Sequence, residues 1–231
     1  MTATPSASAP TAVRVWDLPT RSFHWLLAAC VVASIVSAKI GGNALAWHFR
    51  FGYAILALLA FRLLWGFAGG RWSRFASFLP TPAKLGRYLR GRAQPGEWLE
   101  VGHNPLGALS VFAVLGVLAA QAATGLFADD EIASTGPLVR FVTGSTSLAL
   151  THWHKGAGQW LIFGLVGLHL VAIAFYVGVR RQSLLRPMWN GDKLLPPLAP
   201  ASADGPRQRV LAAVLLAACA AAVTAVVRLG G

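Results

Sequence analysis

The sequence predicts an all-α membrane protein, with a four-helix transmembrane bundle followed by one additional C-terminal transmembrane helix. Hydrophobic residues make up 55% of the 231 residues and charged residues only 12%, whereas a soluble domain carries roughly 25% charged residues. Five stretches approach the ~20 apolar residues that cross a bilayer as a helix. These stretches also lack the two-residue alternation of membrane β-barrel strands, so helices are the structure that satisfies their backbone in lipid.

The chain divides into a tail, a bundle, a linker and a last helix. Residues 1–14 are rich in Thr, Ala, Ser and Pro and are expected to form a flexible cytoplasmic tail. Residues 15–193 hold the four-helix domain, the proline-rich residues 194–209 form a linker, and residues 210–228 form the additional helix. The expected spans cover about residues 23–40, 47–68, 106–128, 153–179 and 210–227.

Basic residues predict the orientation of these spans. Of the 20 Lys and Arg residues, 14 fall on one side if the spans alternate, whereas the other side carries the acidic run Asp129, Asp130 and Glu131. The positive-inside rule then places the N-terminus in the cytoplasm. The net charge of +12 therefore indicates orientation and contact with anionic membrane lipid, and no nucleic-acid partner. The 14 are Arg14, Arg21, Arg71, Arg74, Lys84, Arg87, Arg90, Arg92, Arg180, Arg181, Arg186, Lys193, Arg207 and Arg209.

Four histidines fall at two matching depths in the predicted bundle. His24 and His169 lie toward the cytoplasmic ends of the first and fourth spans, and His48 and His154 toward the outer ends of the second and fourth. In a regular helix, the 15 residues from His154 to His169 correspond to ~22 Å along the axis and ~60° around it. One helix thus presents two histidines on roughly one face. Ionisable residues within membrane spans are functional candidates by default.

These depths predict two haem b groups, each ligated by two histidines. Haem iron takes two axial ligands, and imidazole is a common one; helix bundles build such sites from facing side chains. The predicted iron ligands are His24 with His169, and His48 with His154. Gly52 and Gly158 each lie one turn after an outer ligand, where glycine lets a flat macrocycle approach the backbone. Iron with both axial positions filled transfers electrons and does not bind oxygen.

Two further residues leave alternatives open. His152 is two positions from His154, about 200° round a helix, so only one of them can face the bundle. His154 is favoured because it shares a face with His169, which leaves His152 at the interface, near an outer propionate or substrate. Arg62, inside the second span, is either a bidentate partner of an inner haem propionate or a side chain that snorkels to the cytoplasmic interface.

Several short motifs stand out: RSFHW at 21–25, FRLLWG at 61–66, GHNPLG at 102–107, TGLF at 124–127, His154-Lys155 and Leu168-His169. Together they resemble the bacterial cytochrome b561 family, which includes the b-type cytochrome subunits of nickel–iron hydrogenases. The resemblance covers residues 15–193 and implies four helices with two haems b, held by residues matching His24, His48, His154 and His169. It also implies electron exchange with a quinone and with a redox partner such as a cytochrome c or a hydrogenase, in the bacterial inner membrane. The fifth helix departs from the family's usual four.

Three functions are compatible with these features. The first is a di-haem cytochrome that carries electrons across the membrane between the quinone pool and a redox partner, with His103 and His152 as candidates for a quinone or proton site. The second is an oxidoreductase that takes electrons from superoxide or another small molecule at the outer surface, near Arg140, Lys155 and His152, and passes them to quinone. The third is a non-redox helical protein. Enzymatic turnover and assembly into a homo-oligomer are left open.

Overall fold

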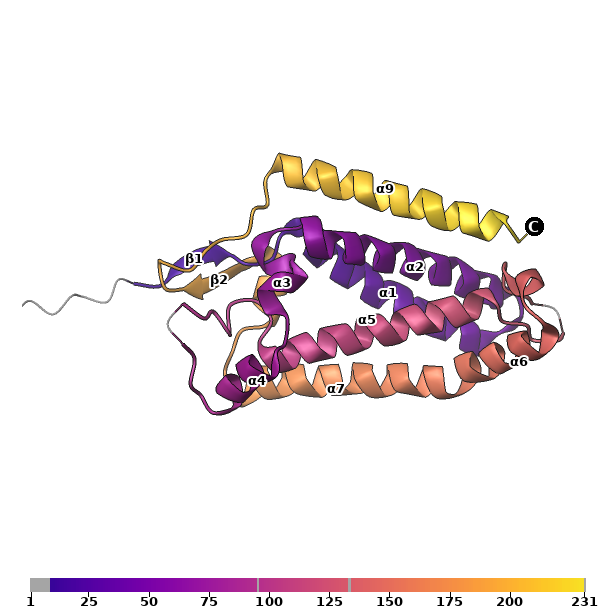
Figure 1. Cartoon of the computed structure of the whole chain (residues 1–231), viewed down its shortest axis with the longest axis horizontal. Coiled ribbons are helices and arrows are strands. Elements are labelled where there is room, and N and C mark those ends of the chain that lie inside the picture. The colour runs from indigo at the N-terminus through magenta and orange to yellow at the C-terminus, as the bar shows by residue number, and fades with distance from the viewer. Residues whose placement is uncertain (1–8, 95, 133, 231) are drawn as a thin grey trace, which may run out of the picture.

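The computed structural model describes residues 9–94, 96–132 and 134–230. It confirms an all-α architecture with five helical segments long and apolar enough to cross a membrane (Figure 1). These are α1 (Leu18–Ile40), η1 with α2 (Gly42–Ala68), α5 (Pro105–Leu126), the composite segment Gly144–Gly178, and α9 (Pro206–Arg228). The chain is thus a multi-pass membrane protein.

The four bundle helices form two adjacent pairs. Helix α1 packs along α2 (Leu45–Ala68), α5 packs along α7 (Gln159–Gly178), and α2 joins the pairs by contacting α5 (Figure 1). The main core lies where these helices meet, and it includes the fully buried Trp65. Its buried members are Phe23, Leu27, Ile55, Leu58, Leu59, Phe61, Trp65, Leu118, Ile162, Ala212 and Cys219.

The fourth span differs from the expected single helix. It begins at Gly144, nine residues before the predicted start, and consists of α6 (Gly144–Trp153), a π-helical turn η4 (His154–Gly158) and α7. Gly156, at φ −101° and ψ −108°, is not helical. The expected angle of ~60° around the axis between His154 and His169 assumed a regular α-helix. The π-turn interrupts that helix, so the angle no longer applies, although both histidines stay in this span.

Two helix starts are defined by capping side chains. Asp17 precedes α1 and accepts a hydrogen bond from Thr20 N, and Asn104 precedes α5 and accepts one from Gly107 N. A proline stands in the first turn of each helix, where its missing N–H costs nothing. Such caps contribute about 1 kcal/mol each. The Asn-Pro of the GHNPLG motif therefore has a structural role as the start of α5.

One end of the bundle carries a two-stranded ribbon and short helices. β1 (Thr11–Arg14) pairs antiparallel with β2 (Asp192–Leu195), so these residues are ordered where a tail and the start of a linker were expected. Residues 1–8 of the predicted tail lie outside the described residues. The short helices at this end are η2 (Arg71–Ser73), α3 (Phe75–Phe78), α4 (Pro82–Leu89) and α8 (Leu185–Asn190), whereas η1 (Gly42–Ala44), which follows α1, and η3 (Val139–Phe141), which precedes α6, lie at the other end.

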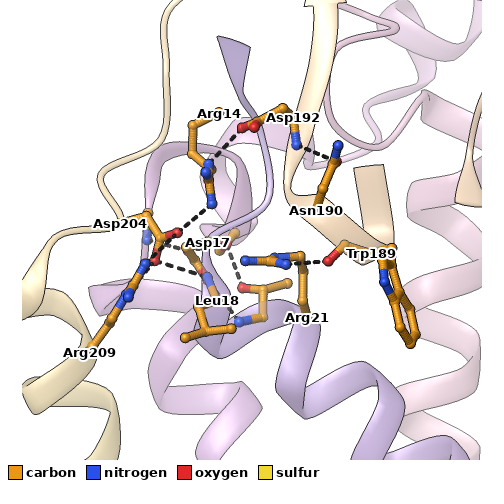
Figure 2. A network of polar contacts seen from close by, with 12 residues as sticks. Arg14, Asp17, Leu18, Arg21, Trp189, Asn190, Asp192, Asp204 and Arg209 are labelled. Carbon is orange, nitrogen blue, oxygen red and sulfur yellow. Dashed lines mark hydrogen bonds and ion pairs between the residues drawn. The ribbon is translucent and has the colours of Figure 1, made fainter. Parts of the chain in front are cut away.

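The additional helix α9 is tied into the bundle and lies along α2 (Figure 1). Just before it, Asp204 accepts hydrogen bonds from the N–H of Leu18 at 3.0 Å and from Arg14 Nη1 at 2.8 Å, and it pairs with Arg209 at 3.3 Å (Figure 2). Arg14 also pairs with Asp192 at 2.7 Å. The network joins the ribbon, the start of α1 and the start of α9, so the predicted linker makes specific contacts.

Candidate functional site

The outer histidine pair lies between α2 and the π-turn. The imidazole centroids of His48 and His154 are 6.0 Å apart and the rings are inclined at 84°. His48 Nδ1 lies 3.0 Å from the carbonyl oxygen of Ser34, which also places its hydroxyl 3.0 Å away. His154 Nδ1 lies 2.9 Å from the backbone carbonyl oxygen of Gln121. Elements far apart in sequence thus converge on one pair of rings.

These backbone contacts fix the tautomer of both outer rings. A carbonyl oxygen only accepts hydrogen bonds, so Nδ1 of His48 and Nδ1 of His154 must each carry the proton. In the neutral imidazole the lone pair is then on Nε2. Metal-ligating histidines typically bind the metal through one ring nitrogen and donate the N–H of the other to a carbonyl or carboxylate.

The inner pair is formed by His24 of α1 and His169 of α7. Their ring centroids are 6.3 Å apart with an interplanar angle of 53°, and the rings of His24 and Trp25 are nearly perpendicular, with centroids 5.0 Å apart. Nδ1 of His24 is buried and has no hydrogen-bond partner among the described residues. The inner pair therefore has nearly the same separation as the outer pair, but His24 is not anchored through Nδ1.

Both separations suit a metal ion held between two imidazoles. A metal–imidazole bond is about 2.0 Å long and the nitrogen lies about 1.1 Å from the ring centre, which places opposing centroids about 6 Å apart. Each pair offers two nitrogen ligands, the number of axial ligands that haem iron takes. The residues present thus fit two haem irons.

A cavity of about 270 Å³ opens beside the outer pair, and both His48 and His154 line it. Gly52 also lines it, and a β-carbon there would meet nothing within 4 Å. Gly158 is placed differently, because a β-carbon there would come 2.1 Å from Gln121 Oε1 and 2.4 Å from Trp153 Cζ3. Of the two glycines predicted to border a macrocycle, Gly52 thus lines the cavity, whereas Gly158 packs against protein.

Arg62 is buried and does not snorkel to the surface. Its side chain is only 3% exposed, its guanidinium lies 4.7 Å from the centre of the Phe75 ring, and Nη1 has no hydrogen-bond partner among the described residues. The nearby carboxylate of Asp17 acts on it electrostatically, but Asp17 already accepts hydrogen bonds from Thr20 N, Trp65 Nε1, Gly70 N and Ser73 Oγ. An unpaired buried guanidinium N–H is suited to an acidic group of a ligand.

Neither of the two remaining candidate histidines belongs to a pair. His103 packs between the rings of Trp16 and Phe78, at 4.7 Å and 4.5 Å between centroids. Burial, reinforced by the charge of Arg62, lowers the pKa of His103 to about 3, so this imidazole is neutral at physiological pH. His152 is exposed on α6, so of the two neighbouring histidines it is His154 that faces His48.

Several residues around the outer pair were not predicted from the sequence. Ser34, Gln121 and Thr124 contact the two rings through the hydrogen bonds described above and through a 3.3 Å contact between Thr124 Oγ1 and His154 Nδ1. Gly125 lies beneath His154. The TGLF motif contains Thr124 and Gly125, but its relation to His154 could not be seen without the packing of α5 on the fourth span.

The family follows from comparison with known sequences. Residues 15–191 match the sequence model described as prokaryotic cytochrome b561. The chain belongs to this family. The matched residues agree to within two positions with the region 15–193 over which the motifs predicted the resemblance. They end before α9, so the additional helix of this b561 cytochrome lies outside the matched unit.

Relatives of this b561 cytochrome carry names of hydrogenase subunits. It is 25% identical over 186 residues to the "Probable Ni/Fe-hydrogenase 1 B-type cytochrome subunit" of Escherichia coli (strain K12), covering 66% of this chain and 78% of that protein. It is 26% identical over 218 residues to the "Probable Ni/Fe-hydrogenase B-type cytochrome subunit" of Azotobacter chroococcum mcd 1, covering 80% and 89%. No solved structure is significantly similar to the chain.

Proposed function

We propose that this b561 cytochrome carries electrons across the bacterial inner membrane between the quinone pool and a redox partner protein. The observation that carries the proposal is the presence of two histidine pairs, with ring centroids 6.3 Å and 6.0 Å apart at two depths of one bundle. Membership of the b561 family implies haem b. Bound haem b would supply a one-electron redox couple, and two haems at different depths would allow electrons to pass across the membrane.

Different residues of the chain have different proposed roles in haem binding. His24 with His169, and His48 with His154, are the proposed axial ligands. The carbonyl oxygens of Ser34 and Gln121 hold the outer rings in the tautomer that leaves Nε2 available. Arg62 is the proposed partner of an inner propionate, because its buried Nη1 lacks a partner among the described residues.

The proposed partners and orientation are supported by the family and by the distribution of charge. Relatives named as hydrogenase cytochrome subunits support a hydrogenase-like redox partner for this chain, and the family resemblance supports quinone exchange. The ribbon, α3 and α4 lie at one end of the bundle and α6 at the other (Figure 1). The basic residues of the ribbon, of α4 and of the loops beside them support a cytoplasmic location for the ribbon end. His103, neutral and close to Arg62, is the proposed polar group of a quinone site.

The test uses the full chain purified from membranes in detergent. A pyridine haemochrome assay should give two haems b per chain. His24→Ala and His169→Ala should each lose the same haem, and His48→Ala and His154→Ala the other, as resolved by redox titration of the reduced-minus-oxidised spectrum. His152→Ala is the matched control, since His152 is exposed two residues from His154, and it should keep both haems.

Two outcomes would contradict the proposal. A wild-type protein that contains no haem b would refute the electron-transfer function as a whole. Equal loss of both haems in all four variants, with His152→Ala intact, would refute the proposed pairing.

A further inference from the structure

One polar residue inside the membrane contacts the proposed outer ligand from two directions. Gln121 lies in α5 and faces the π-turn η4. Its side-chain Nε2 donates a hydrogen bond of 2.8 Å to the carbonyl oxygen of His154, while its backbone carbonyl oxygen accepts from His154 Nδ1 at 2.9 Å. A single residue thus holds both the backbone and the ring of His154.

The carbonyl group that accepts from the Gln121 side chain belongs to the π-turn. His154 begins this turn, in which Gly156 departs from helical angles and the N–H of Gln159 donates to the Gly156 carbonyl oxygen. A π-turn interrupts the regular pattern of backbone hydrogen bonds, and an unpaired carbonyl within a membrane costs several kcal/mol. Gln121 supplies a donor to the carbonyl of His154 from the neighbouring helix.

Two glycines give Gln121 and His154 the room that they need. A β-carbon at position 158 would come 2.1 Å from Gln121 Oε1, so glycine lets the amide enter the turn. A β-carbon at position 125 would come 2.9 Å from His154 Cε1, so glycine lets the ring lie against α5. The side chain, the π-turn and both glycines form one arrangement, which we call the His154 clamp: Gln121, Gly125, His154 and Gly158.

We infer that Gln121 is a positioning residue that sets the orientation and electron donation of His154 toward the outer iron; this inference rests on the proposed ligation. By fixing the His154 backbone, its amide keeps Nδ1 within hydrogen-bonding distance of the Gln121 backbone carbonyl oxygen. That bond makes the imidazole a stronger electron donor, which stabilises ferric iron and lowers its reduction potential. His24 of the inner pair has no corresponding Nδ1 bond among the described residues.

The test compares Gln121→Leu with Gln159→Leu in the full-length haem-loaded protein. The side chain of Gln159 makes a polar interhelical contact close by, accepting from Lys39 Nζ at 3.0 Å, but it makes no hydrogen bond to His154 among the described contacts. The measurements are the midpoint potentials of both haems and their ferric low-spin electron paramagnetic resonance signals, with the outer haem assigned from His48→Ala. Gln121→Leu should raise the potential of the outer haem and shift its signal, whereas Gln159→Leu should change neither.

Gly158→Ala tests the clamp without altering Gln121. It should displace the amide and shift the outer haem in the same direction as Gln121→Leu. If Gln121→Leu does not accumulate in membranes, Gln121→Met removes the donor with a flexible side chain of similar length, and the same shift is expected.

The outcomes separate this inference from the proposed function. Unchanged outer-haem values in Gln121→Leu, or equal shifts of both haems, would overturn the positioning role while the wild-type haem content and the histidine variants still supported electron transfer. A wild-type protein with no haem would overturn both. Loss of the outer haem alone from Gln121→Leu, with both haems kept in Gln159→Leu, would support the inference.

Discussion

Gly125 lies directly beneath the ring of His154: a β-carbon at position 125 would come within 2.9 Å of His154 Cε1 and 3.3 Å of Nδ1. A side chain at position 125 would displace the imidazole and so change its placement relative to His48, whose ring centroid is 6.0 Å from that of His154. The separation that suits a shared iron therefore depends on a residue that contributes no atom to the ligand set.

Gly125→Ala should accordingly remove the outer haem and spare the inner one. The haem content measured by pyridine haemochrome is expected to fall from two per chain toward one. Gly116→Ala is the matched control in the same helix, because a β-carbon there would meet nothing within 4 Å. Equal haem content in the two variants would show that the ring tolerates the displacement.

Arg62→Met should lower the midpoint potential of the inner haem. The substitution removes a buried positive charge that we propose lies beside an inner haem propionate, and a nearby cation disfavours ferric iron; an effect of roughly 1 kcal/mol is expected. Redox titration of the inner haem checks this value, and Arg62→Lys, which keeps the charge, should retain part of the wild-type potential. A shift of the outer haem alone would contradict the placement of Arg62 at the inner site.

Asp17→Asn should destabilise the fold by about 3 kcal/mol or more, because a fully buried carboxylate that serves four donors loses its charge and one acceptor position. Thermal unfolding in detergent, followed by loss of helical circular dichroism, measures the change. Asp192→Asn is the control, since Asp192 pairs with Arg14 at a partly exposed site, where ion pairs contribute at most about 1 kcal/mol. Similar losses in both variants would show that the Asp17 network contributes no more than a surface pair.

Asp204→Asn should loosen α9 in a pH-dependent manner. Burial alone would raise the pKa of Asp204, but hydrogen bonds from Leu18 N and Arg209, with the charge of Arg14, bring it below its ordinary 3.8. The folded state therefore favours the carboxylate, whose contribution of about 1–3 kcal/mol is present above about pH 4 and is lost as pH falls through the lowered pKa. Wild type should unfold at a higher temperature than the variant at pH 7, and the difference should shrink below about pH 4. A constant difference at all pH values would contradict the assignment.

Local features of the chain were sufficient to define the class of the protein and the residues worth testing. Span length and apolar composition are local properties, so all five membrane helices could be located from the amino-acid order alone. A histidine or arginine within such a span is costly enough to stand out individually, which is why His24, His48, His154 and His169 could be paired by depth. Arg62 stood out in the same way, but the sequence could not decide whether its side chain is buried in the bundle or snorkels to the cytoplasmic interface.

Which side chains meet was settled by the packing of the helices. The exposure of His152, the π-turn that begins at His154 and the contact of Gln121 with that turn depend on how α5 packs against a segment about 30 residues away. Gly158 was predicted to border a macrocycle, and its packing against Gln121 likewise depends on how α5 packs against the fourth span. The ribbon of β1 and β2 and the tether at Asp204 join residues about 180 positions apart, where no local pattern signals the partner. Hydrophobic periodicity specifies what a helix buries, whereas the partner of a hydrogen bond between helices depends on packing that distant parts of the chain create together.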